Sequence, residues 1–231
     1  RGYASSLFYP ELFLYIPAVF RLLGMTIEGS YKLFALLMII GCFVSTYLCV
    51  KGMTKNKYSA LIVAVIFSTC QYHIANLYVR GAVGEAQSFV FFPMVVYGIY
   101  DLIYGDFKKP WVMGLGFWGL MFSHSISLVI ALCATAGICL FHFKTVVLNG
   151  KKFGKLILTA VVTLLCSIGF WLPMIEQLLS NEFYFSQPWT TVTDNAVGLI
   201  QIFGAGYYDY TYNFDTMVLL MCLLFFLLPK A

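Results

Sequence analysis

Apolar residues fill most of this chain in runs that approach twenty residues, roughly the length of a helix that crosses the hydrocarbon core of a bilayer. Short polar stretches separate the runs, so each run predicts a membrane-spanning helix. The pattern therefore predicts an all-α polytopic membrane protein. The expected spans lie at about 31–50, 58–77, 88–104, 111–123, 125–143, 156–175 and 216–229.

The same pattern divides the chain into four parts. Residues 1–30 form an external loop with an interfacial helix, 31–175 form a transmembrane core of about six spans, 176–215 form a long external loop, and 216–231 form a final, truncated span. Within the core, the short and glycine-rich run 111–123 is expected to form a tight helical hairpin with the next run, turning at Ser123-His124-Ser125.

The interfacial helix is expected between Pro10, which suits a first helical turn, and Gly24, which suits a helix end. Its apolar residues share one face, as in helices that lie on a membrane surface. The face consists of Leu12, Ile16, Val19, Phe20 and Leu23. The alternative is half of a span kinked at Pro17, which would submerge the charges of Glu11 and Arg21 in lipid.

Composition agrees with a membrane protein, since 61% of the residues are hydrophobic and only 10% are charged. All seven cysteines lie inside apolar runs, which favours small buried side chains over a disulfide or zinc framework. The chain begins at Arg1 rather than Met, and its last apolar run stops at Pro229-Lys230-Ala231. We therefore expect a piece of a longer protein.

The basic residues are distributed by membrane side. At one set of ends of the predicted spans, which would share one side of the membrane, there are only four Lys or Arg residues: Arg1, Arg21, Lys32 and Arg80. The other ten lie at the opposite ends of the predicted spans, at Lys51, Lys55, Lys57, Lys108, Lys109, Lys144, Lys151, Lys152, Lys155 and Lys230. By the positive-inside rule the lysine-rich loops are cytoplasmic, and Arg80, Glu85 and His124 are external. The net charge of +4 is thus a topology signal and does not indicate a nucleic-acid partner.

The polar stretch from Asn76 to Glu85 interrupts two apolar runs with an arginine and a glutamate. One interpretation is a short solvent loop in which Arg80 and Glu85 pair with each other. The other is a functional site, because ionisable groups beside membrane spans are costly to keep.

Several residue types near this stretch suit an anionic ligand. His73, Asn76 and Arg80 share one helical stripe, with Tyr72 beside them, and an arginine fork binds phosphate with two parallel hydrogen bonds. Gly81 and Gly84 are expected to leave room for the ligand.

Glu85 opens the next span and has two candidate roles, general base or metal ligand. His124 is the other external group that titrates near neutral pH. A divalent cation held by Glu85 and His124 is one option, although these two ligands alone do not make a metal site.

The predicted loop 176–215 is rich in aromatic and amide side chains, with Trp189 among them. Such side chains suit a sugar ring or a lipid headgroup, and the alternative is an interfacial aromatic belt. No nucleophile elbow, P-loop, dinucleotide fingerprint or zinc spacing is present in the sequence.

Three motifs resemble the bacterial membrane proteins called 6-pyruvoyl-tetrahydropterin-synthase-related, which belong with the GT-C glycosyltransferase superfamily. They are Leu7-Phe8-Tyr9-Pro10, the stretch Asn76-Leu77-Tyr78-Val79-Arg80-Gly81-Ala82 with Glu85, and Ser123-His124. The resemblance implies a GT-C-like helical bundle in the bacterial cytoplasmic membrane. It also implies transfer of a sugar from a polyprenyl-phosphate donor to an acceptor at the extracytoplasmic face.

By this resemblance Arg80 would hold the lipid phosphate, Glu85 and His124 would act as catalytic groups, and the 176–215 loop would cover the acceptor. The candidates for substrate binding are His73, Asn76, Tyr78, Arg80 and Trp189. The acidic residue of the first external loop of GT-C enzymes should precede Tyr3 and is not in this chain. Two other functions stay open, a transporter or flippase for lipid-linked substrates and a non-catalytic structural subunit.

Overall fold

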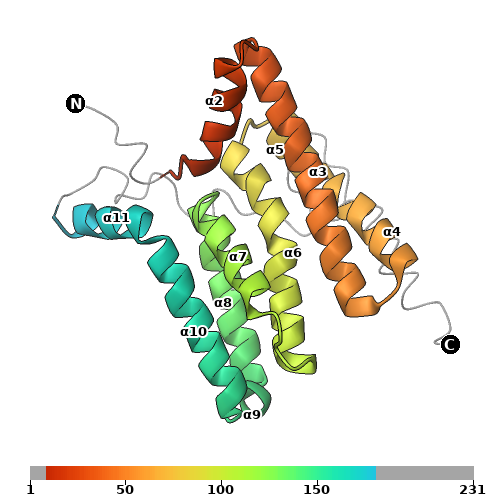
Figure 1. The fold of residues 1–231 in the computed structure, drawn as a ribbon, viewed down its shortest axis with the longest axis vertical. Coiled ribbons are helices and arrows are strands. Elements are labelled where there is room, and N and C mark those ends of the chain that lie inside the picture. The colour runs from red at the N-terminus through yellow and green to blue at the C-terminus, as the bar shows by residue number, and fades with distance from the viewer. Residues whose placement is uncertain (1–8, 181–231) are drawn as a thin grey trace, which may run out of the picture.

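The computed structural model describes residues 9–180, which fold entirely into helices and connecting turns with no strand among them (Figure 1). The predicted all-α class is therefore confirmed for this part of the chain. The elements are the short 3-10 turn η1 (Leu12–Leu14) and the helices α2 (Tyr15–Leu22), α3 (Ile27–Thr54), α4 (Lys57–Ser68), α5 (Gln71–Tyr78), α6 (Val83–Tyr104), α7 (Pro110–Met121), α8 (Ser125–Phe141), α9 (Phe143–Val146), α10 (Gly150–Cys166) and α11 (Ile168–Ser180).

Helices α3 and α4 form an antiparallel hairpin whose turn is defined by its capping residues. Lys55 ends α3 in the left-handed conformation, with φ of 58°. The side chain of Asn56 then accepts hydrogen bonds from the backbone N–H groups of Tyr58 and Ser59, at 2.9 and 3.3 Å, which caps α4. The polar residues between the two runs thus make a helix stop followed directly by a helix start.

The expected span 58–77 is broken between α4 and α5, which meet at an angle of 41°. The break leaves the Ser68 carbonyl without a helical partner, and the ring Nδ1 of His73 donates a hydrogen bond to it at 2.8 Å. The His73 ring is fully buried and stacks on Phe89, with 4.6 Å between ring centroids. His73 therefore stabilises the break and packs α5 against α6.

The expected span 156–175 is also interrupted, because α10 and α11 meet at 77°. Ser167 lies at the bend, and its hydroxyl donates to the carbonyl of Thr163 at 2.7 Å, within the last turn of α10. Figure 1 shows α11 running across the axis of the bundle while α10 runs along it. Hydropathy did not predict this bend because the residues on both sides of it are apolar.

Glycines bring α6 and α7 close together. A Cβ atom at Gly98 would lie 2.4 Å from Met113, and one at Gly116 would lie 2.8 Å from Val95. Small residues at a helix interface allow this approach, as they commonly do between membrane helices. The predicted hairpin is also present, since α7 ends at Met121 and α8 begins at Ser125.

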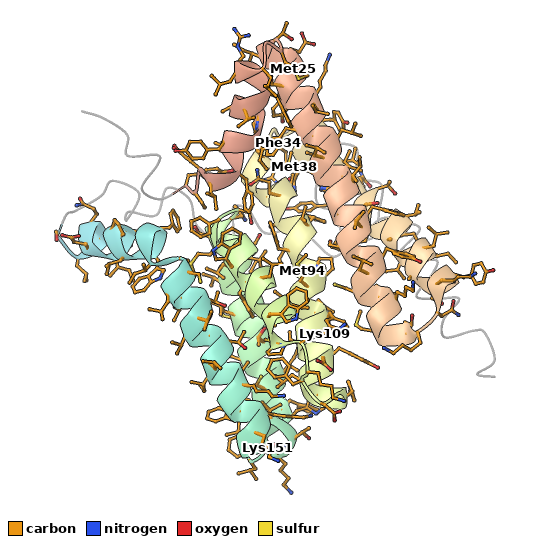
Figure 2. All side chains as sticks on the ribbon, in the orientation of Figure 1. Met25, Phe34, Met38, Met94, Lys109 and Lys151 are labelled. Atoms are coloured by element: carbon orange, nitrogen blue, oxygen red, sulfur yellow. The ribbon has the colours of Figure 1, made fainter. Side chains whose placement is uncertain are left out.

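A second packing centre lies between α3, α5 and α6. It consists of Phe34, Ala35, Met38, Leu77 and Ala86. Figure 2 labels Phe34 and Met38 on the upper part of α3, where they are among the buried residues of this cluster. The aromatic ring of Phe13 stacks on Phe91 at 5.3 Å, which ties η1 to α6.

The lysine-bearing turns between α3 and α4, α6 and α7, and α8 and α10 lie at the same end of the bundle, where Figure 2 labels Lys109 and Lys151. Two lysines bind backbone there: Nζ of Lys152 donates to the Leu102 carbonyl at 2.7 Å, and Nζ of Lys155 donates to the Phe107 carbonyl at 3.0 Å. The turn between α5 and α6 lies at the other end of α6.

Two described helices, α3 and α6, are long and apolar enough to cross a bilayer, and counting each bent pair as one span raises the number to four. Helices α7 and α8 contain 12 and 17 residues and are shorter than a full span. The expected seventh span, 216–229, and most of the 176–215 loop lie outside the described residues.

Candidate functional site

A tight turn places Arg80 and Glu85 next to each other. The backbone N–H of Arg80 donates to the Ala75 carbonyl at 2.8 Å, and that of Ala82 donates to the Asn76 carbonyl at 2.8 Å. Gly81 has φ of 62°, the left-handed conformation that glycine adopts without strain. The turn reverses the chain after α5 and puts Glu85 in the first turn of α6.

One nitrogen of Arg80 organises the side chains around it. Nη1 donates to Oδ1 of Asn76 at 2.7 Å, to Oε2 of Glu85 at 2.9 Å and to the hydroxyl of Tyr72 at 3.3 Å. The Tyr72 hydroxyl in turn donates to Oε1 of Glu85. Both carboxylate oxygens of Glu85 therefore accept a hydrogen bond. We call Tyr72, Asn76, Arg80 and Glu85 the rim cluster.

The rim cluster contains an ion pair, as the solvent-loop interpretation of the sequence predicts, but it is not a freely solvated one. The side chain of Arg80 is 35% exposed and that of Glu85 only 17%. Burial alone would lower the pKa of Arg80, but the hydrogen bond with Tyr72 and the charge of Glu85 raise it above its ordinary value. The guanidinium is therefore held charged, with one edge committed to protein partners.

Asn76 adds an unsatisfied donor to the cluster. Its side chain is fully buried, and its Oδ1 accepts from Arg80 while Nδ2 has no hydrogen-bond partner among the described residues. Asn76 therefore supports Arg80 from inside the protein, where its own side chain is not exposed.

Gly84 joins the rim cluster to two other segments. Its backbone N–H donates to the hydroxyl of Tyr9 at 2.9 Å. A Cβ atom at this position would lie 2.4 Å from the carbonyl oxygen of Ser123 and 2.5 Å from the Tyr9 hydroxyl. Glycine is thus required because two other segments approach it, and the sequence-based expectation that Gly84 makes room for a ligand is corrected.

His124 lies in the turn between α7 and α8, at the position before the first residue of α8, with its Nδ1 3.4 Å from the backbone nitrogen of Ser127. Its Nδ1 is 2.8 Å from the hydroxyl of Ser127, which is 3.3 Å from that of Ser88. Ser88 donates to the backbone carbonyl of Glu85 at 2.6 Å. Burial lowers the pKa of His124, while the charge of Glu85 raises it and that of Arg80 lowers it. The ring is therefore neutral at neutral pH and adjoins the rim cluster.

The structure brings Asn76, Arg80, Glu85 and His124 together at one end of the bundle. It places His73 inside the core, bonded to the Ser68 carbonyl, and leaves Tyr78 69% exposed at the end of α5. Trp189 lies outside the described residues. Within residues 9–180, no three His, Cys, Asp or Glu side chains gather into a group that could hold a metal ion.

Three members of this arrangement were not singled out by the sequence as candidates: Tyr9, Ser88 and Ser127. A signal for the two serines exists, because each follows an ionisable residue by three positions, Ser88 after Glu85 and Ser127 after His124. That spacing is one helical turn. Tyr9 reaches Gly84 from far away in the chain, which no local pattern predicts.

Two cavities formed by the described residues lie away from the rim cluster. An open apolar groove of about 550 Å³ lies between α7 and α10 and is lined by residues such as Trp111, Trp118 and Leu158. Another, of about 300 Å³, lies between η1, α10 and α11 and includes Glu11 and Phe170. Rim-cluster residues line neither of them, so hydrogen bonding and burial identify the candidate site.

The fold and the site together define a helical membrane protein that carries a partly buried polar cluster at one end of its bundle. The chain belongs to the family described as the 6-pyruvoyl-tetrahydropterin synthase related domain, a membrane-protein family whose model matches residues 7–227. The resemblance to this family found in the sequence is thus confirmed, and the link to the GT-C superfamily stays a prediction. No curated protein and no solved structure matches the chain.

Proposed function

We propose that this protein is a GT-C-like membrane glycosyltransferase that moves a sugar from a polyprenyl-phosphate donor to an acceptor at the extracytoplasmic face of the bacterial cytoplasmic membrane. The observation that carries the proposal is the rim cluster. It holds a partly exposed arginine beside a largely buried carboxylate at the end of the bundle that bears few lysines.

The orientation rests on charge and on two helices with apolar surfaces. The lysine-rich turns are assigned to the cytoplasm by the positive-inside rule, which puts the rim cluster outside. Helices α2 and α11 have no buried residues, and they expose Val19 and Leu22 on one and Leu172 and Leu179 on the other. These surfaces suit helices that lie in the membrane interface at the same end as the rim cluster.

Arg80 is the proposed phosphate ligand. All three hydrogen bonds of its side chain described above use Nη1, so Nη2 and Nε form an edge of the guanidinium that is suited to two parallel bonds with phosphate oxygens. Glu85 and Asn76 orient the guanidinium from the protein side. Tyr78 and Trp189 remain proposed contributors to substrate binding, whereas His73 is buried in the core and supports the position of α5.

Glu85 and His124 are the proposed catalytic groups. Both Glu85 oxygens accept hydrogen bonds, from Tyr72 and Arg80, so its proposed role is to hold the guanidinium in place. His124 is neutral and suits the proton acceptor. In the transfer step the acceptor oxygen attacks the anomeric carbon and its proton passes to His124. The carbon–oxygen bond to phosphate breaks, and the electron pair leaves with the polyprenyl phosphate.

Charge reversal of Arg80 tests the proposal. Membranes that contain the full-length protein are supplied with polyprenyl-phosphate sugars, and transfer is measured for wild type, Arg80→Glu and the control Lys108→Glu at the lysine end. We expect transfer in wild type and the control and none in Arg80→Glu, at equal expression. Full transfer by Arg80→Glu contradicts the phosphate role, and translocation of the lipid without transfer supports a flippase instead.

A further inference from the structure

Four groups form a continuous chain from His124 to the backbone of α6. The chain runs from Nδ1 of His124 to the Ser127 hydroxyl at 2.8 Å and to the Ser88 hydroxyl at 3.3 Å, and it ends at the Glu85 carbonyl oxygen, 2.6 Å from Ser88. Ser88 is fully buried and Ser127 is 6% exposed. Proton positions in this chain are therefore determined by the protein groups themselves.

Counting protons gives the chain one direction. A carbonyl oxygen can only accept, so Ser88 must give its single hydroxyl proton to Glu85. Its oxygen can then bond to Ser127 only by accepting, which uses the proton of Ser127. The Ser127 oxygen must in turn accept from His124, so the proton of the neutral ring is on Nδ1.

One contact opposes this direction. The backbone N–H of Ser127 points at Nδ1 from 3.4 Å and would require a lone pair there. That distance is at the long end for a hydrogen bond, whereas the contact of 2.8 Å between Nδ1 and the Ser127 hydroxyl is near the optimum. If Nδ1 accepted from the Ser127 hydroxyl, the contact between the two serines would contain no proton. Both directions keep the contact of 2.8 Å, and the directed chain also places a proton in the contact of 3.3 Å between the two serines.

We propose that Ser88 and Ser127 are positioning residues that hold the neutral His124 ring with its proton on Nδ1 and its lone pair on Nε2. The common reason to fix one nitrogen of a histidine is to present the other to a partner. When Nε2 takes a proton, Nδ1 keeps its bond to Ser127 and each acceptor oxygen in the chain still faces the positive ring. The chain thus stabilises the imidazolium without rearranging.

The consequence for catalysis rests on the proposed function, because it makes Nε2 of His124 the atom that accepts the proton of the acceptor hydroxyl. The tautomer itself does not depend on that function. It is a property of the resting protein, which the geometry of Ser88, Ser127 and Glu85 determines.

Nitrogen NMR on the full-length protein with isotopically labelled histidine tests the inference. The chain has three histidines, and a His124→Gln variant identifies the signals of His124. At about pH 8, above the ordinary pKa of histidine, the ring is neutral and its bare and protonated nitrogens give well-separated signals. We expect the proton on Nδ1 in the wild type. A proton on Nε2 overturns the inference.

The variant Ser88→Ala sharpens the test without altering the histidine or its neighbour Ser127. Removing the Ser88 hydroxyl frees the proton of Ser127 to bond to Nδ1, so we expect the ring to shift toward the Nε2-protonated form. The control Ser125→Ala changes a serine in the same turn and should keep the wild-type tautomer. A Ser88→Ala protein with an unchanged tautomer contradicts the proposed role of the hydrogen-bond chain.

Activity separates the two proposals. If the His124 ring is protonated on Nδ1 in a protein that shows no transfer, the hydrogen-bond chain stands and the proposed glycosyltransferase activity is refuted. If the protein shows transfer and its His124 ring is protonated on Nε2, the proposed activity stands and the role of the hydrogen-bond chain is refuted.

Discussion

The two ends of the bundle contain ion pairs of nearly equal length in very different surroundings. Lys108 and Asp106 approach to 2.8 Å at the lysine end, with side chains 78% and 73% exposed, whereas Arg80 and Glu85 approach to 2.9 Å with side chains 35% and 17% exposed. Only the second pair has hydrogen bonds to Tyr72 and Asn76. The comparison shows that burial and additional partners, rather than the distance between two charges, distinguish a candidate site.

The other polar side chains at the two ends differ as well. At the lysine end, Lys152 and Lys155 donate to backbone carbonyls at the end of α6 and just beyond it, where positive charge complements the helix dipole. These lysines therefore stabilise α10 against α6. At the rim, by contrast, the amide of Asn76 remains unpaired among the described residues. The lysines thus hold two segments together, whereas the rim cluster leaves part of the Arg80 side chain exposed.

The largest effect on the protein is expected from Gly84→Ala. The new methyl group would lie 2.4 Å from the Ser123 carbonyl oxygen, so α6 and the α7–α8 turn must separate. Overpacking of this kind costs about 1–3 kcal/mol and here displaces the rim cluster too. Thermal unfolding in detergent and the transfer assay should both show a loss. The control is Gly154→Ala on α10, where a Cβ meets open space. Equal losses in the two variants would contradict the close contact of Gly84 with Ser123 and Tyr9 as the cause.

The next effect is expected from Glu85→Gln, which keeps the shape of the side chain and removes its charge. Arg80 then loses its charge-assisted partner, and bonds of this kind contribute about 1.5–3 kcal/mol. We predict lower thermal stability and loss of transfer, whereas Asp106→Asn at the lysine end should leave both unchanged. If the two variants behave alike, the contrast between the two ends is wrong.

A smaller and reversible effect is expected from pH. Burial lowers the pKa of His124 below its ordinary value near 6.5, with Glu85 opposing and Arg80 adding to the shift. The unfolded chain therefore binds the proton first as pH falls, so the stability contributed by neutral His124 is complete above about pH 6.5 and is lost below it. Transfer should fall in the same range. His124→Gln should remove this part of the stability profile, and an unchanged profile would contradict the assignment.

The smallest effect is expected from Glu28→Gln, near the start of α3. Glu28 and Lys32 form an ion pair of 2.5 Å, but their side chains are 76% and 73% exposed. Exposed pairs are screened by solvent and add little. Neither thermal stability nor transfer should change measurably. A clear loss of thermal stability or of transfer would mean that the exposed fraction of an ion pair does not indicate its importance in this protein.

Hydropathy predicted much of the fold because the long apolar runs are intact in α3 and α6 and because Ser123–Ser125 forms the expected hairpin turn. It missed the break after Ser68, although Thr69, Gln71 and His73 interrupt the apolar run there. It also missed the bend at Ser167, because the run around that residue stays apolar. Run length alone cannot distinguish a straight helix from two helices at an angle.

The site was predictable where its contacts are local. Asn76 and Arg80 are four residues apart, and the structure joins them directly although Arg80 lies just past the end of α5. The contact between Tyr72 and Glu85 crosses the turn, and the contact between Tyr9 and Gly84 joins distant segments, so neither follows from helical spacing. The three motifs that marked the family meet around Gly84, which the sequence could not show.

The most direct test of the central claim is binding of a polyprenyl phosphate to the purified full-length protein in lipid nanodiscs. Wild type is compared with Arg80→Gln and with the lysine-end control Lys108→Gln. Loss of a charge-assisted contact of about 1.5–3 kcal/mol corresponds to roughly 10- to 150-fold weaker binding. We predict that loss for Arg80→Gln and wild-type affinity for Lys108→Gln. Equal affinity in all three proteins would contradict the rim cluster as a phosphate site.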